Sequence, residues 1–253
     1  MQVNSQNTQK DFRQDLFHQL NLTQSPEHVD IIKQTLKHVQ LGHPLELFAR
    51  GVSDFGYDAG IVDMFLHDVD HPFSVEQCLE LTEASGLVFQ GWIDNFYYYP
   101  EGQVPITSPI FPRLQALPEA DRWRAMELYH GAVTQHAFYI THPERDPETY
   151  VIDFESKAFT HYIPRMRVNH FEQADPTNNR PAMIQRIPFP KLPLNEVQLN
   201  MVAAVNGERT IMEIIKEAKV HGQRDEAILS TCNFFRSLWR IGYMTFKKPI
   251  KHQ

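Results

Sequence analysis

Apolar side chains recur at helical spacing through the first third of the chain. Residues 11–21 carry them on one helical face. A second helical pattern has Ser25 as N-cap, Pro26 in its first turn and Gly42 as its stop. Shorter helical patterns follow at residues 43–51 and 57–67. The pattern therefore predicts a helical opening third without strands.

The pattern changes after residue 72, where a helix, a glycine stop and a strand follow one another. Ser74 and Gln77 have the spacing of a capping box, in which each side chain satisfies a backbone amide of the other residue. Gly86 is able to adopt the left-handed conformation that ends many helices. The stretch LVFQGW at 87–92 then predicts a strand.

Strands and proline-rich segments alternate between residues 95 and 193. The stretch 95–114 is aromatic and then proline-rich, which predicts a loop or an edge hairpin. A helix is predicted from Pro118 onward, followed by strands at 136–142, 149–156 and 160–168. Residues 172–193 hold five prolines in 22 positions, so they predict a linker or an extended strap.

The last sixty residues predict three helices followed by a short strand pair. The helical patterns lie at 194–207, 209–219 and 225–242, and an apolar and polar alternation follows at 243–249. This is the outline of a small winged helix. The chain is therefore divided into a first part, residues 1–171, the proline-rich segment 172–193, and a winged-helix-like domain, residues 194–253.

Composition places the chain among globular proteins. It has 253 residues, of which 42% are hydrophobic and 22% charged. No apolar run is long enough to cross a membrane, and the polar N-terminus lacks the apolar segment of a secretory signal, so we expect a cytoplasmic protein. Cys78 and Cys232 are expected to be two buried thiols, since each lies in a helical pattern.

Charge is distributed unevenly along the chain. The formal net charge is −7. From residue 194 onward nine Lys and Arg stand against six Asp and Glu, which gives +3 there and leaves −10 for residues 1–193. An acidic chain is not expected to bind polyanions generally, so nucleic acid is not the expected partner.

Four potential metal ligands lie within the five residues HDVDH, namely His67, Asp68, Asp70 and His71. Histidine and carboxylate side chains suit Zn, Mn or Fe, so a metal-dependent hydrolase using His67 and Asp68 is one interpretation. Adjacent residues point in different directions on a regular backbone, however, which argues against convergence on one ion. Acidic residues just before a helix also complement its dipole. A polar turn that leads into the helix at Ser74 is the other interpretation.

Other catalytic motifs are absent from the sequence. The eleven glycines form no G-x-G-x-x-G and no phosphate-binding loop, and there is no G-x-S-x-G. The aromatic run Phe96, Tyr97, Tyr98 and Tyr99 suits either stacking on a flat substrate or packing at a sheet edge.

Two stretches resemble a known family. FSVEQCLELTEASGLVFQGW resembles the late helix and following strand of class I S-adenosylmethionine-dependent methyltransferases. The preceding residues resemble an insertion in one bacterial branch of that family, where an Asp-x-x-x-x-Asp-x-Phe-Leu-His string recurs. The positions that match it are Asp58, Asp63, Phe65, Leu66, His67 and Asp70. His71 departs from the pattern, where an arginine is expected. The last sixty residues are similar to small winged-helix modules related to peptide chaperones in cofactor maturation.

The resemblance implies an α+β fold, in which part of a methyltransferase sheet with a helical cap is joined to a winged-helix-like domain. In that family the cofactor is held by a glycine-rich loop after the first strand, and the sequence shows no such loop. We therefore expect that this chain alone binds no S-adenosylmethionine and that a separate cofactor-binding half, or another protein, is its partner.

The resemblance also suggests an acceptor pocket. Its candidate residues are Asp63, His67, Asp70, Tyr97, Tyr98 and Tyr99. His67 is the candidate proton acceptor. The alternative from another functional class is a non-enzymatic module that binds a protein or a peptide through the aromatic run and the C-terminal domain.

Overall fold

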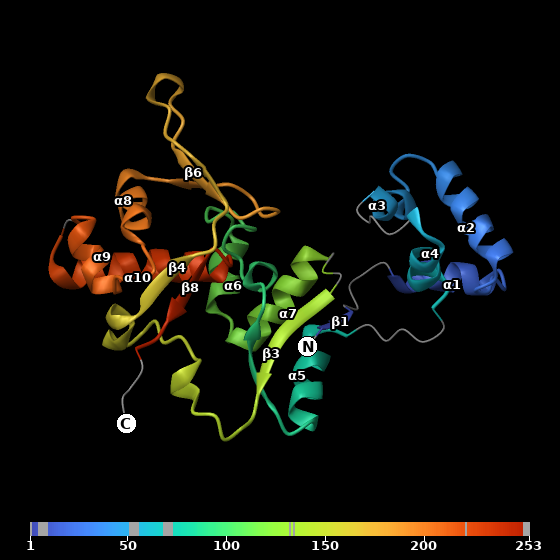
Figure 1. Ribbon diagram of the computed structural model, residues 1–253, viewed down its shortest axis with the longest axis horizontal. Helices are drawn as coiled ribbons and strands as arrows, with labels where there is room; N and C mark the ends of the chain where they lie inside the picture. The colour runs from blue at the N-terminus through green and yellow to red at the C-terminus, as the bar shows by residue number, and fades with distance from the viewer. Residues whose placement is uncertain are drawn as a thin grey trace. The chain divides into compact units, whose positions relative to one another are not determined.

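The computed structural model describes residues 2–4, 10–50, 56–67, 73–131, 133, 135–220 and 222–249 (Figure 1). For residues 2–4, 10–13 and 47–48 it describes the backbone only. The chain forms two compact units. The first comprises residues 2–78 and 127–136, and the second comprises residues 79–126 and 137–253. Among the described residues, no helix combines the length and the apolar character that crossing a membrane requires.

Four helices and a short strand open the first unit. They are β1 (Gln2–Asn4), α1 (Lys10–Gln19), α2 (Pro26–His38), α3 (Pro44–Arg50) and α4 (Asp58–Phe65). The four predicted helices are confirmed, whereas the prediction of no strand is wrong because β1 is a strand. Three residues with a single apolar side chain are too short to show a strand pattern in the sequence.

Local chemistry explains where α2 begins. The Ser25 side chain accepts a hydrogen bond from the backbone N–H of His28, and Pro26 is the first helical residue. The helix ends at His38, before the predicted stop at Gly42, because Val39 is extended. The first unit has its own core, in which Phe17 and Phe65 pack edge to face with ring centroids 5.3 Å apart. Its buried residues are Phe17, Val29, Ile32, Leu45, Ile61, Phe65 and Leu66.

The predicted capping box and glycine stop both form around α5 (Val75–Ala84). The backbone N–H of Ser74 donates to Oε1 of Gln77 at 3.0 Å, and the N–H of Gln77 donates to Oγ of Ser74 at 3.2 Å. Gly86 has φ +70°, and the N–H of Leu87 returns to the carbonyl oxygen of Thr82. The sequence signals at both ends of this helix are therefore confirmed.

The second unit mixes helices with short strands. Its helices are α6 (Ile110–Ala116), α7 (Glu119–His130, whose last turn belongs to the first unit), α8 (Glu196–Ala204), α9 (Ile211–Glu217) and α10 (Arg224–Arg240). Its strands are β2 (Val88–Trp92), β3 (Gln135–Thr141, whose first two residues belong to the first unit), β4 (Ile163–Met166), β5 (His170–Glu172), β6 (Ala182–Gln185), β7 (Leu192–Leu194) and β8 (Met244–Lys247). Short 3-10 helices are η2 (Asn95–Tyr98), η3 (Pro147–Thr149), η4 (Lys157–His161) and η5 (Pro176–Asn178).

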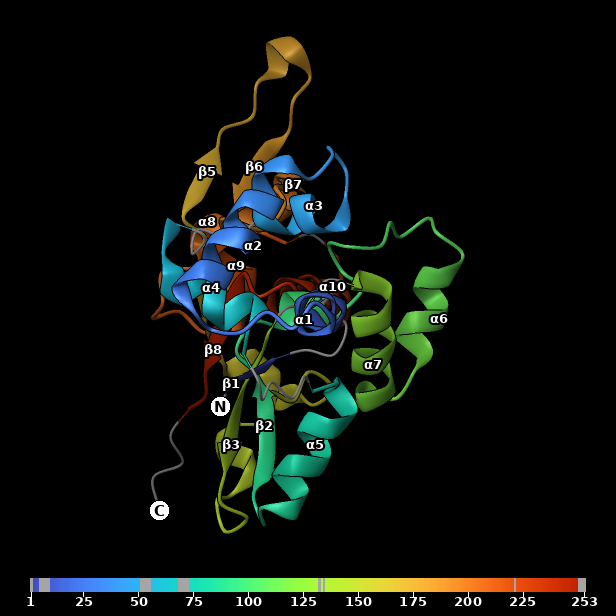
Figure 2. The ribbon, with the colours of Figure 1, turned by 90° about the vertical axis from the view of Figure 1, so that its right-hand side faces the viewer.

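The strand pairs β2–β3, β4–β8, β5–β6 and β6–β7 are all antiparallel. Figure 2 shows β2 beside β3, where the register shifts between Phe89 and Gly91. The hairpin that joins β5 to β6 extends away from the rest of its unit (Figures 1 and 2). The predicted α+β mixture is confirmed at this coarse level, but the sheets are small and antiparallel.

Residues 149–156, which follow the short helix η3, do not form the predicted strand. The Asp153 carboxylate accepts the backbone N–H groups of Glu155 and Ser156, which bends the chain into a turn. Phe154 packs against Trp239 of α10, with ring centroids 5.3 Å apart. A local side-chain bond thus replaces the ladder that the apolar pattern predicted.

The proline-rich segment 172–193 contains β6 and most of the β5–β6–β7 sheet. Ile184 and Phe189 from this segment belong to the second unit's core, and Ala182 is also buried. Part of this segment therefore packs into that core. The three C-terminal helices also form where predicted, but β8 pairs with β4, which lies outside residues 194–253. The winged-helix assignment stays a prediction.

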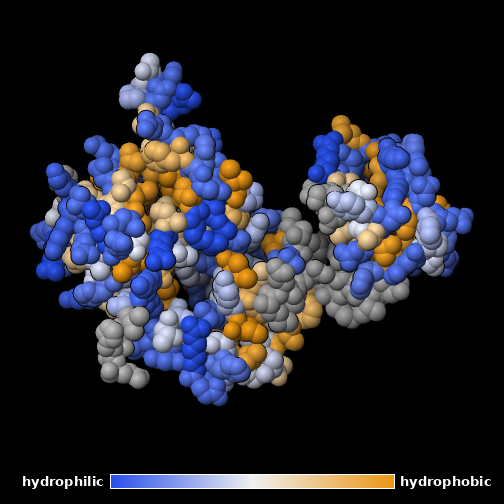
Figure 3. All heavy atoms as spheres, viewed as in Figure 1, coloured by the Kyte–Doolittle hydropathy of each residue, from blue (hydrophilic) through white to orange (hydrophobic). Residues whose placement is uncertain are grey.

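The large core of the second unit gathers side chains from the proline-rich segment, from η2 and η4, and from the last three helices. Its fully buried residues include Phe159, Ile211, Ile214, Phe235, Leu238, Tyr243 and Met244. A smaller cluster lies around α6 and α7 and contains Val104, Phe111, Leu114 and Met126. On the face drawn in Figure 3, hydrophobic side chains lie among hydrophilic ones near the base of the β5–β6 hairpin, and Phe171 and Ile187 are exposed hydrophobic residues of this region.

Candidate functional site

The three neighbouring tyrosines have three different surroundings. Tyr98 is 2% exposed and stacks on Trp92, with ring centroids 3.8 Å apart. Tyr99 is 1% exposed, and its hydroxyl donates to Oε1 of Glu119 at 2.6 Å. Tyr97 is only half-buried and packs against Phe189. Because Tyr98 and Tyr99 belong to the interior, Tyr97 is the tyrosine of the run whose side chain is partly exposed.

Two arginines and one carboxylate lie beside Tyr97. Oδ1 of Asp94 is 2.5 Å from Nη1 of Arg186 and 3.7 Å from Nη2 of Arg167. Arg186 also donates to the carbonyl oxygen of Gly242 and lies over the ring of Phe189. The Arg186 side chain is 15% exposed, whereas Arg167 and Asp94 are each 33% exposed. We call Asp94, Tyr97, Arg167 and Arg186 the Asp94 cluster.

The Asp94 cluster has a net positive charge, since one carboxylate faces two guanidinium groups. Burial raises the pKa of Tyr97, and the Asp94 carboxylate raises it further, while Arg186 lowers it. Tyr97 is therefore a neutral phenol near pH 7, able to donate a hydrogen bond but not to act as a base. The loosely paired Arg167 retains donors for a carboxylate or another oxyanion.

The surroundings of Tyr99 are a separate, buried ion cluster. Nη1 of Arg240 lies 2.6 Å from Oε1 of Glu101, and its guanidinium lies over the Tyr99 ring at 5.1 Å. Arg122 donates to the carbonyl oxygens of Leu114, Gln115 and Leu117, which closes the C-terminal end of α6. Burial, followed by the charge of Glu119, raises the pKa of Tyr99 well above its usual value. These contacts join α6, α7 and α10, so Tyr99 helps to hold these helices together.

The remaining candidates belong to the first unit. Asp63 lies on α4 and is exposed, and His67 is an exposed residue just beyond that helix. Asp70 lies outside the described residues, as do Asp68 and His71 of the predicted metal cluster. Within the described ranges, no group of three or more His, Cys, Asp or Glu side chains is arranged to hold a metal ion.

The sequence interpretation missed a buried pair in the first unit. Nε2 of His136 lies 3.0 Å from Oε1 of Glu127, and Oε2 of Glu127 accepts the backbone N–H of Val75 at the start of α5. Burial, followed by the charge of Glu127, raises the pKa of the Cys78 thiol to about 12. The inward position of His136 two residues before Phe138 on a predicted strand was the signal available for it.

The fold is similar to two solved structures of PKMT2 from Rickettsia typhi. One is similar with a TM-score of 0.58, and the other, in complex with AdoHcy, with a TM-score of 0.56. In both cases the identity is 16%, and the similarity covers 98% of this chain and 52% of the PKMT2 chain. No family model matches the sequence. PKMT2 is a protein lysine methyltransferase, and this chain shares the fold of about half of it.

Proposed function

We propose that this chain is the acceptor-side module of an S-adenosylmethionine-dependent methyltransferase. The similarity to PKMT2 carries this proposal, because it extends over nearly all of this chain but only half of the other. The sequence resemblance around residues 57–92 points to the same family independently. The methyl acceptor proposed here is a protein side chain, by analogy with the lysine methyltransferase neighbour.

The cofactor is proposed to be held by another polypeptide part. AdoHcy, found in one PKMT2 structure, is what remains of S-adenosylmethionine after methyl transfer. The present sequence contributes no glycine-rich loop of the kind that holds this cofactor in class I enzymes. We therefore propose that the chain is inactive until it associates with a cofactor-binding half.

Two groups of residues are proposed to serve the acceptor. His67, with Asp63 and Asp70, supplies the proton acceptor that a protonated amine needs before it can attack a methyl group. The Asp94 cluster supplies donors for a carboxylate on the acceptor protein, through Arg167 and the Tyr97 hydroxyl.

Calorimetry tests the cofactor part of the proposal. S-adenosylmethionine is titrated into the purified chain, and no binding is expected. The same titration into a mixture with a candidate cofactor-binding half is expected to show saturable binding, together with methyl transfer to an acceptor protein. Tight binding by the chain alone would contradict the proposal.

Substitution tests the role of His67 in the reconstituted pair. His67→Gln is expected to lower the rate of methyl transfer by about 10²-fold or more if His67 accepts the proton. His142→Gln serves as the matched control, because His142 is also exposed and lies on the surface of the other unit. An unchanged rate in His67→Gln would remove His67 from the mechanism while leaving the fold-based proposal intact.

A further inference from the structure

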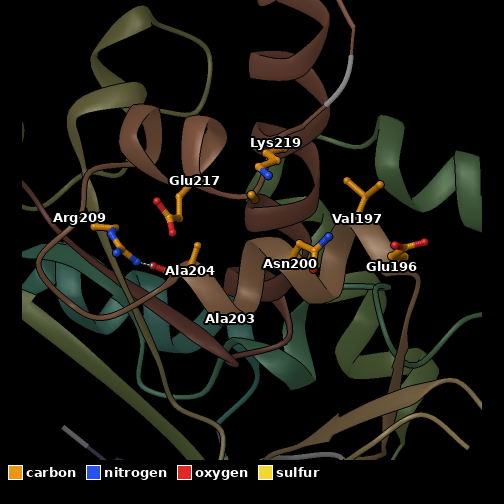
Figure 4. Close-up of a pocket in the computed structure, with 9 residues that line it drawn as sticks. Glu196, Val197, Asn200, Ala203, Ala204, Arg209, Glu217 and Lys219 are labelled. Atoms are coloured by element: carbon orange, nitrogen blue, oxygen red, sulfur yellow. Dashed lines mark hydrogen bonds between the residues drawn. The ribbon is translucent and has the colours of Figure 1, made fainter.

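A hollow of about 590 Å³ lies along α8 and the end of α9 (Figure 4). Its volume is within the range of about 300–1,000 Å³ typical of ligand sites. It contains none of the residues of the Asp94 cluster. The residues that line it are Glu196, Val197, Asn200, Ala203, Ala204, Arg209, Glu217, Ala218 and Lys219. We call it the α8–α9 hollow.

The hollow has an apolar part and a charged rim. Three alanines and a valine supply small apolar side chains, whereas the rim carries two acidic and two basic residues. Arg209 already makes a hydrogen bond within the chain, since its Nη1 donates to the carbonyl oxygen of Ala204 at 3.1 Å (Figure 4). In the part of the chain that the structure describes, the side chains of Asn200, Glu217 and Lys219 make no hydrogen bond or ion pair.

Lys219 occupies a position where glycine is preferred. Its φ is +49°, and it follows α9 in a Schellman motif, in which the N–H of Val220 returns to the carbonyl oxygen of Ile215. The corresponding positions after α5 and α10 are Gly86 and Gly242. A lysine in this left-handed conformation is strained by its Cβ, and stability of the turn therefore does not explain it.

Glu217 is also placed against local preference. It ends α9, where the helix dipole disfavours a negative charge. Lys219 and Glu217 both line the hollow from the same turn, and neither makes an ion pair with the other. Two locally unfavourable placements therefore lie beside one hollow.

We propose that the α8–α9 hollow binds a short peptide segment that carries one acidic and one basic side chain. Lys219 pairs with the acidic side chain and Glu217 with the basic one, while the Asn200 amide bonds the peptide backbone. The alanine-lined surface accepts the aliphatic stem of the basic residue. The two rim carboxylates disfavour a nucleic acid or another polyanion. This binding does not depend on the proposed methyltransferase function.

A fluorescein-labelled, end-blocked peptide of sequence Ala-Lys-Ala-Ala-Glu-Ala is the probe, titrated with the whole chain and followed by fluorescence polarisation. The two comparison peptides replace its charged residues by two lysines or by two glutamates. Saturable binding of the mixed peptide is expected, with the single-sign peptides about tenfold weaker or more, because each places one like charge against the rim.

Lys219→Gly and Glu217→Gln are each expected to weaken binding of the mixed peptide by about tenfold. Lys216→Gln and Glu208→Gln are the matched controls, since neither residue lines the hollow, and they should leave its affinity within about twofold. Thermal unfolding of each variant verifies that it is folded. The proposal is overturned if the mixed peptide shows no binding up to about 5 mM, if the three peptides bind equally, or if Lys219→Gly and Glu217→Gln bind as the unsubstituted chain does.

Discussion

Nη1 of Arg240 lies 2.6 Å from Oε1 of Glu101, and the two side chains are only 17% and 9% exposed. The pair joins residues 139 positions apart, so it ties the end of α10 to the loop after η2. Gln115 of α6 donates to the same carboxylate oxygen at 3.2 Å. A buried pair of this kind holds its surroundings together mainly because either charge would be costly alone.

Glu101→Gln should therefore destabilise the chain strongly. It leaves the Arg240 guanidinium buried without a counter-charge, and we expect a loss of about 3 kcal/mol in the free energy of unfolding. Urea unfolding at pH 7 measures this. Asp121→Asn is the control, because it removes a largely exposed pair with Arg124 and should cost less than about 1 kcal/mol. Equal losses in the two variants would show that burial of the Arg240 pair contributes nothing.

Gly242→Ala should destabilise more than an ordinary left-handed glycine replacement. Gly242 has φ +74°, and an added Cβ would lie 2.7 Å from Nη1 of Arg186, so the guanidinium that donates to the Gly242 carbonyl oxygen must shift. The strain and the lost charged hydrogen bond together should cost about 2–3 kcal/mol.

Gly207→Ala is the matched control for that substitution. Gly207 has φ +80°, but the nearest atom to an added Cβ there is 3.7 Å away, on Arg165. Only the strain of the left-handed conformation remains, at about 1 kcal/mol. If the two variants unfold at the same urea concentration, Arg186 does not depend on the absence of a side chain at Gly242.

The sequence predicted what local interactions determine. Ser74 and Gln77 form their capping box because both partners lie within one turn, and Gly86 ends α5 for the same reason. The Asp94 cluster could not be predicted from the sequence, because Asp94 and Arg186 are brought together by packing of segments 92 positions apart. No spacing rule connects them.

The aromatic run shows a different failure. Tyr97 and Tyr98 end the 3-10 helix η2, and Tyr99 follows it in an extended conformation. Tyr98 and Tyr99 enter the interior, whereas Tyr97 lies in the Asp94 cluster. The sequence interpretation treated the members of the run alike. Their separate roles depend on partners such as Trp92 and Glu119, which the run itself does not indicate.

Stability should fall between pH 9 and about pH 12 through Cys78. Its thiol has a raised pKa of about 12 in the folded chain against 9.0 when unperturbed, because of burial and the charge of Glu127. Over that interval the unfolded chain loses this proton while the folded chain keeps it, so rising pH favours unfolding. Urea midpoints measured from pH 8 to pH 10.5 should fall less steeply in Cys78→Ala than in the unsubstituted chain. Parallel slopes would show that Cys78 does not titrate in this way.

Lys219→Gly should make the chain more stable. Glycine relieves the strain of φ +49° after α9, although it also gives the unfolded chain more freedom, so the net gain should be about 0.5–1 kcal/mol. Lys216→Gly is the control, since Lys216 lies inside α9 and the same change there should cost about 1 kcal/mol. Urea unfolding should therefore show changes of opposite sign for the same Lys→Gly substitution at two positions that differ in backbone conformation. A loss of stability in Lys219→Gly would mean that the lysine supports the turn, and its left-handed conformation would then not point to a binding role at the α8–α9 hollow.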